Sequence, residues 1–172
     1  MAPNTSLLAD LLPGSLDIIG DVHGEIDHLE TLLDQLGYRA NGVHPADRRL
    51  VFVGDLTDRG PDSPAVVRRV RELVEAERAQ CVLGNHELNI LRGEAKEGNR
   101  WITEQRRETY SYGESVEDAN PLGPLGQGDV MCVDYAVGHR ARERAEGASE
   151  RQAFLAAYRW PEREVVFSEC DV

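Results

Sequence analysis

Three short stretches of the sequence carry side chains that bind metals and transfer protons. They read GDVHG (20–24), GDLTDRG (54–60) and GNHE (84–87), and each opens with a glycine that precedes a carboxylate or an amide. Together they offer carboxylate, amide and imidazole groups, a mixture that suits Mn²⁺, Fe or Zn²⁺ better than Mg²⁺. Two such ions about 3.5–4 Å apart clamp the attacking and leaving oxygens of a displacement at phosphorus. The ligand-type residues are Asp21, His23, Asp55, Asn85 and His86.

The residues around these motifs predict the elements that position them. Short apolar blocks at 16–19, 50–53 and 81–83 each run into a motif glycine, a pattern typical of buried strands. Between them, apolar residues keep helical spacing over 26–36 before Gly37, and over 63–74 with Ser63 as N-cap and Pro64 at the first helical position. The order β-α-β-α-β predicts an α/β fold with a parallel sheet. In such a sheet the three motifs meet at the carboxyl ends of the strands.

The whole chain, 1–172, is expected to form a single domain of three parts. The motifs occupy a half at 15–92, followed by an irregular stretch at 93–128 without a convincing strand. The last part, 129–172, predicts a strand at 129–138, a charged, alanine-rich helix around 149–160 and a final apolar segment at 164–168.

Composition narrows the function classes. The 19 Lys and Arg residues against 31 Asp and Glu residues give a formal charge of −12, which argues against nucleic acid or an anionic membrane as partner. The N-terminal stretch lacks a basic region before its apolar residues, so a cytoplasmic protein is the expectation. The scattered Cys81, Cys132 and Cys170 predict reduced thiols, the first two in apolar strands.

The three motifs, in this order, resemble the signature GDxHG, GDxxDRG, GNHE of the calcineurin-like metallophosphoesterases, in particular the phosphoprotein phosphatase branch. The resemblance implies that the parallel sheet is half of that family's sandwich, with two divalent transition metal ions (Mn, Fe or Zn) as cofactors. It further implies that Asp21 and His23 bind the first ion, that Asp55 bridges both, and that Asn85 binds the second.

The same resemblance implies catalytic roles for three residues. His86 would be the general acid that protonates the leaving oxygen, and Asp58 would orient and charge it, since a neighbouring carboxylate favours the protonated imidazole. Arg59 would hold a phosphate oxygen, for which a guanidinium fork is well shaped. Glu87 is expected to brace the turn at 84–87.

The resemblance weakens beyond the third motif. The family completes its second metal site with two later histidines, whereas only His139 follows His86 here. The segment before His139 resembles the family strand that follows the Gly-His ligand, so His139 is not expected to be that ligand. One hypothesis is that the chain lacks an internal block that relatives carry between about residues 100 and 130. His28 and His44 are interpreted as structural or solvent-facing.

These observations leave several functions open. The leading hypothesis is a phosphatase that hydrolyses phosphomonoesters, with a phosphoprotein as substrate, through a metal-bound hydroxide. The alternative is a hydrolase of dinucleoside polyphosphates, which shares GDxHG and GNHE; the symmetrically cleaving type is associated with Ala before Arg-Gly, where this chain has Asp58, although the distinction is imperfect. A degenerate relative that binds metal or a partner without turnover is the third hypothesis. A plain α/β binding domain without metal would require all three motifs to be accidental.

Overall fold

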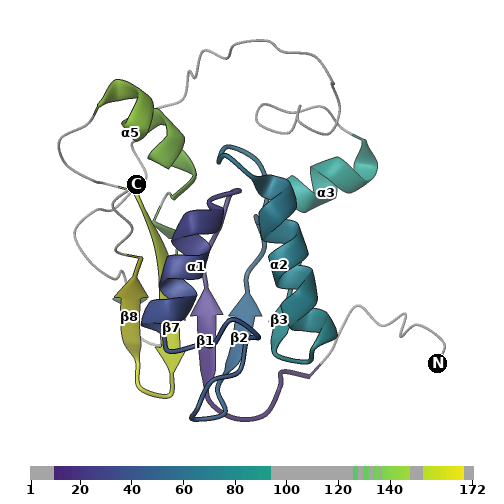
Figure 1. Cartoon of the computed structure of the whole chain (residues 1–172), viewed down its shortest axis with the longest axis vertical. Helices are drawn as coiled ribbons and strands as arrows, with labels where there is room; N and C mark the ends of the chain where they lie inside the picture. The colour runs from purple at the N-terminus through teal and green to yellow at the C-terminus, as the bar shows by residue number, and fades with distance from the viewer. Residues whose placement is uncertain are drawn as a thin grey trace.

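The computed structural model describes residues 10–93, 126–127, 130–131, 134–135, 137–147 and 153–168. The motif-bearing half alternates strands and helices as β1 (Leu16–Ile19), α1 (Ile26–Gln35), β2 (Arg49–Phe52), α2 (Ser63–Glu75) and β3 (Ala79–Cys81). Strand β2 pairs in parallel with both β1 and β3. The expected β-α-β-α-β arrangement is therefore confirmed, and α1 and α2 lie over one face of the sheet (Figure 1).

The remaining described elements follow β3 along the chain; some of their strands extend the sheet on the other side of β1, and one pair forms a separate two-stranded sheet. They are α3 (Asn85–Arg92), β4 (Gly126–Gln127), β5 (Val130–Met131), β6 (Asp134–Tyr135), the 3₁₀ helix η1 (Val137–His139), α5 (Arg140–Glu146), β7 (Phe154–Trp160) and β8 (Glu164–Phe167). The strand order is β3-β2-β1-β7-β6, with β8 also paired to β7. Because β7 runs antiparallel to β1, the parallel strands form only part of a mixed sheet.

The prediction of a helix around 149–160 is wrong for the part that the structure describes, residues 153–160. Residues 154–160 form β7, which lies between β1 and its other neighbours. Leu155, Ala156 and Ala157 are consecutive and fully buried, so this strand lacks the alternating pattern that reveals a half-buried strand. Its alanines favour a helix in isolation, and pairing with β1 overrides that propensity.

Other boundaries also differ from expectation. The third strand ends at Cys81, and Val82 and Leu83 are 58% and 57% exposed, because pairing with β2 stops there and the chain turns into α3. Helix α2 has Asp62, not Ser63, as N-cap, since the Asp62 carboxylate accepts a hydrogen bond from Ala65 N. Among the described residues of the expected strand 129–138, β5 and β6 are strands, and Val137 and Gly138 begin η1.

One further expectation for the C-terminal part is confirmed, and one element there was not predicted. Strand β8 confirms the expected apolar segment at 164–168, whereas α5 was not expected at all. Cys81 lies in β3 as a free thiol, while Cys132, Cys170 and most of 93–128 fall outside the described residues. Within the described ranges, no helix is long and apolar enough to cross a membrane.

The core lies between α1, α2 and the sheet. Ile19, Leu50 and Phe52 from the central strands are fully buried. They pack with the apolar stripes of the two helices, which were predicted from their spacing; the buried members are Leu29, Leu32, Leu33, Leu36, Val66, Val70 and Leu73. Val67 and Val74 also belong to the apolar stripe that the spacing over 63–74 predicts, but they are 39% and 40% exposed.

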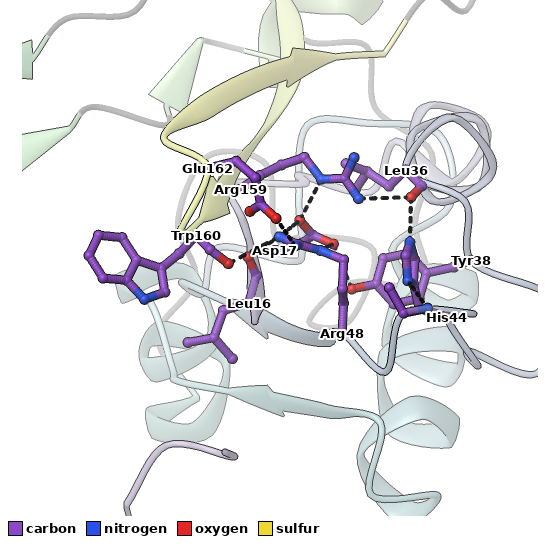
Figure 2. Close-up of polar contacts among 10 residues, drawn as sticks. Leu16, Asp17, Leu36, Tyr38, His44, Arg48, Arg159, Trp160 and Glu162 are labelled. Carbon is purple, nitrogen blue, oxygen red and sulfur yellow. Dashed lines mark hydrogen bonds and ion pairs between the residues drawn. The ribbon is translucent and has the colours of Figure 1, made fainter. Parts of the chain in front are cut away.

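A buried carboxylate at the amino end of β1 joins the sheet to its surroundings. Asp17, inside a block interpreted as apolar, is fully buried. It accepts hydrogen bonds from Tyr38 Oη (2.7 Å), from Arg48 Nε and Nη2 (2.9 and 2.7 Å) and from Arg159 Nε (3.0 Å), as Figure 2 shows. Arg48 also donates to Glu162 Oε1 at 2.8 Å. The network therefore ties β1 to β7 and to the chain around α1.

Candidate metal centre

The first two motif loops are bonded to each other beyond the carboxyl ends of β1 and β2. The amides of Val22 and His23 both donate to the Asp55 carbonyl, at 3.0 and 2.9 Å. Gly60 N donates to the His23 carbonyl at 2.8 Å, and a side-chain carbon at position 60 would lie 2.2 Å from that oxygen. Glycine is thus required there for the close approach of the two loops.

Glu87 fastens the third loop to the second. Its Oε2 accepts from the amides of Asp55 and Gly84, at 2.8 and 3.0 Å. Its Oε1 accepts from Leu56 N at 2.9 Å and from Thr57 N and Oγ1, at 3.2 and 3.0 Å. The expected brace of the 84–87 turn is confirmed, and the same carboxylate also holds the second loop, a role that sequence reasoning missed.

Three of the expected site residues converge. Ligand atoms of His23, Asp55 and His86 all lie within 4.8 Å of one another. Asp21 lies beside them, with its Oδ2 3.7 Å from His23 Nε2. Asn85 is the first residue of α3, and its side chain is exposed. The cluster therefore includes His86, which the resemblance assigned to proton transfer instead of metal binding.

The protonation of His23 suits a metal ligand. Its Nδ1 lies 3.0 Å from the Thr57 carbonyl, which can only accept, so Nδ1 carries the hydrogen and Nε2 keeps its lone pair. Burial, together with the positive charge of Arg59, lowers the pKa of His23 to about 4, and the imidazole is neutral at pH 7. The neutral imidazole and the Asp55 and Asp21 carboxylates could hold a divalent transition metal. Thr57 acts through its backbone, so no residue-type signal could have revealed its part.

Asp58 and Arg59 lie against the two histidines. The buried Asp58 carboxylate is 2.7 Å from His86 Nδ1, as the expected pair requires, and Asp58 N donates to Ser63 Oγ at 2.8 Å. Ser63 thus supports Asp58 instead of capping α2. Arg59 Nη1 lies 3.3 Å from His23 Nε2, which places the guanidinium at the edge of the cluster.

The backbone around the site is strained. His23, Asp55, Asp58 and Arg59 have φ of +46°, +47°, +74° and +66°, values in the left-handed region that residues other than glycine seldom adopt. Each such residue costs about 1–2 kcal/mol relative to ordinary backbone, so the surrounding bonds must enforce the conformation. Such a group of left-handed residues within short loops is typical of functional sites.

The other histidines lie outside the cluster of three. His28 is buried, with Nδ1 2.9 Å from Ser168 Oγ. His44 accepts from Ala46 N through Nδ1 and donates through Nε2 to the Leu36 carbonyl, at 3.0 Å each. Both are therefore structural, as expected. His139, at the end of η1, is half-buried, and whether it reaches a metal stays a prediction.

The motifs and the fold agree with a match to a known family. The family model for calcineurin-like phosphoesterases matches residues 15–165, most of the chain. The chain therefore belongs to the calcineurin-like phosphoesterase family. A solved crystal structure of a candidate diadenosine tetraphosphatase has the same fold, with a TM-score of 0.52 and 19% identity over 90% of this chain and 92% of that one.

Curated relatives are similar to part of the chain. Residues of this chain are 53% identical over 74 positions to the bis(5'-nucleosyl)-tetraphosphatase PrpE [asymmetrical] of Oceanobacillus iheyensis, covering 41% of this chain and 30% of the relative. A second relative, the symmetrical bis(5'-nucleosyl)-tetraphosphatase of Ralstonia nicotianae, is 35% identical over 144 positions, covering 72% of this chain and 48% of the relative. The chain thus spans less than half the length of these two relatives.

Proposed function

We propose that this chain carries the motif-bearing part of a metal-dependent hydrolase that cleaves the polyphosphate bridge of dinucleoside tetraphosphates. The observation that carries the proposal is the convergence of His23, Asp55 and His86, with Asp58 bonded to His86. The substrate class rests on the names of the relatives, which are tetraphosphatases and favour the nucleotide alternative over a phosphoprotein.

The chain's own residues supply the remaining parts of such a reaction. Divalent ions, a first held by Asp21, His23 and Asp55 and a second held by Asp55 and Asn85, would polarise a phosphoryl oxygen and make water a stronger nucleophile. Arg59, at the edge of the cluster, would bind a phosphate oxygen through its guanidinium. His86, whose Nδ1 is bonded to Asp58, would protonate the leaving phosphate oxygen from Nε2.

The substrate is tested by comparing diadenosine tetraphosphate with a phosphoserine peptide and p-nitrophenyl phosphate, each with added Mn²⁺. We expect kcat/KM for the dinucleotide to exceed that for the peptide at least about 100-fold. A peptide that is hydrolysed as well as the dinucleotide would refute the substrate class. Absence of turnover on all three would favour the degenerate relative, and metal stoichiometry per chain, one ion or two, would then show whether the second site is incomplete.

The role of His86 is tested separately, because its place in the cluster also permits metal binding. In His86→Asn we expect kcat to fall by about 100-fold or more, with the Mn²⁺ dissociation constant within threefold of the parent. Asp58→Asn should follow the same pattern. Loss of Mn²⁺ binding in His86→Asn would instead make His86 a ligand.

A further inference from the structure

A C-terminal turn closes over the first two motif loops. Gly138 in η1 is buried, and a side-chain carbon at this position would lie 2.8 Å from Cδ of Arg59 and 2.8 Å from Cδ2 of His23. Gly138 is not among the residues with positive φ, so its backbone would accept an alanine. Glycine is therefore required here by the space that Arg59 and His23 occupy.

The helix that follows this turn is held to the first motif loop by a buried charge. Arg144 in α5 donates from Nη2 and Nη1 to the two carboxylate oxygens of Glu25, at 2.8 and 3.1 Å. Glu25 directly follows the GDVHG motif and is only 2% exposed. Two-point binding of a guanidinium fixes orientation as well as distance. The ion pair therefore sets how η1 and α5 sit on the motif loops.

We propose that η1 and α5 form a third wall of the site, in which Gly138 is a positioning residue for the Arg59 guanidinium and the Glu25–Arg144 pair holds the wall in place. The proposal rests on the proposed function, in which Arg59 binds phosphate. It assigns to Gly138 and Arg144, which lie outside the three motifs, a role in positioning the residue that binds phosphate.

Arg59 is the neighbour that a larger residue at 138 would displace. The His23 ring is held by the hydrogen bond from Nδ1 to the Thr57 carbonyl, and its backbone lies in a strained, tightly bonded loop. Arg59 has a long, flexible side chain, and its guanidinium reaches His23 Nε2 at 3.3 Å. Pressure at Cδ would therefore turn the guanidinium away from the cluster, while the imidazole keeps its place.

The test is calorimetric titration of inorganic phosphate into protein saturated with Mn²⁺. We expect Gly138→Ala to raise the phosphate dissociation constant about tenfold, the effect of losing one charge-assisted hydrogen bond. Arg59→Ala should have a similar effect. In the double variant, Gly138→Ala should add less than twofold, because the side chain on which it acts is absent.

A matched pair on α5 tests the anchor. Arg144→Ala should weaken phosphate binding at least about threefold. Arg142→Ala should leave it unchanged, because Arg142 pairs with Glu146 on the exposed side of the same helix. Equal phosphate affinity in Arg144→Ala and the parent would overturn the role of the anchor.

Other outcomes separate this proposal from the proposed function. A phosphate dissociation constant of Gly138→Ala within twofold of the parent would overturn the positioning role. So would a Gly138→Ala effect of equal size in the presence and in the absence of the Arg59 side chain. Neither result would affect the proposed function. If the parent protein bound no phosphate, the proposed function would fail. The Arg59 Nε–Hε resonance, assigned with Arg59→Lys, would then decide the geometry: a shift in Gly138→Ala supports the contact, and an unchanged resonance overturns it.

Discussion

Removal of the Asp17 carboxylate is expected to be among the most destabilising single changes in the sheet. Asp17→Ala would leave Arg48, which is 4% exposed, without the two hydrogen bonds that Asp17 accepts from Nε and Nη2. Tyr38 Oη and Arg159 Nε would each lose a partner too. Breaking a buried charge pair by removing one member costs about 3–5 kcal/mol. For a domain of this size that corresponds to a fall in Tm of about 10 °C.

The measurement is urea unfolding at pH 7, with Asp47→Ala as the matched control. Asp47 also pairs with an arginine, Arg49, but its side chain is 85% exposed, so we expect a change within about 0.5 kcal/mol. If Asp17→Ala lowered the free energy of unfolding no more than Asp47→Ala does, the network would not stabilise the fold. Should Asp17→Ala not fold, the milder Asp17→Asn would carry the comparison.

The stability that Asp17 contributes should decrease as the pH falls. Burial alone would raise the pKa of Asp17, but hydrogen bonds from Arg48 and Tyr38 and the charge of Arg159 together lower it. A carboxylate whose pKa is lower in the folded state contributes stability above its unfolded pKa, about 3.9, and loses it as pH falls through the folded value. The difference in unfolding free energy between the parent and Asp17→Asn should therefore shrink below about pH 4. A constant difference down to pH 2 would contradict this assignment.

Three further predictions concern the motif loops. Glu87→Gln puts an amide donor where the carboxylate accepts hydrogen bonds from Asp55 N and Gly84 N, so the free energy of unfolding in urea should fall by about 2–3 kcal/mol. A fall of less than about 0.5 kcal/mol would show that Glu87 does not brace the loops. Gly54→Ala would place a side-chain carbon 2.4 Å from Gly84 N in a residue with φ +104°, and it should lower the free energy of unfolding by more than about 2 kcal/mol. Gly93→Ala is the control, because the space around Gly93 is open and only backbone strain of about 1 kcal/mol acts there. Burial and the charge of Glu87 raise the pKa of Cys81 to about 11. Iodoacetamide at pH 8 should therefore modify Cys81 at least about 100-fold more slowly in the folded protein than in protein unfolded by urea, as followed by mass spectrometry. Equal rates in the two states would show an exposed thiol.

The sequence predicts the motif-bearing half well because local signals and tertiary structure agree there. Apolar blocks end at motif glycines, the helices carry apolar stripes, and the parallel order follows from the alternation. The pair of Asp58 with His86 could be anticipated, because it follows from a known motif. The fine geometry could not, since the close approach at Gly60 depends on a contact between loops that are far apart in the chain.

The C-terminal part misleads sequence reasoning for a physical reason. The alanines of β7 are good helix formers, and only its position beside β1 makes it a strand. Asp17 was missed because a carboxylate within an apolar block gives no local sign that two arginines, 31 and 142 residues away, will meet it. The contact of Gly138 with Arg59 is equally non-local.

The left-handed backbone at Asp58 and Arg59 has a consequence for engineering and for evolutionary drift. Glycine would adopt these conformations without strain. At Arg59, whose guanidinium lies 3.3 Å from His23 Nε2, replacement by glycine would relax the loop while removing the guanidinium. Selection for thermal robustness alone would thus tend to erase this part of the site. An arginine kept at position 59 would therefore reflect selection for the reaction. A library of variants at position 59, sorted first for folding and then for turnover, would separate selection for stability from selection for activity.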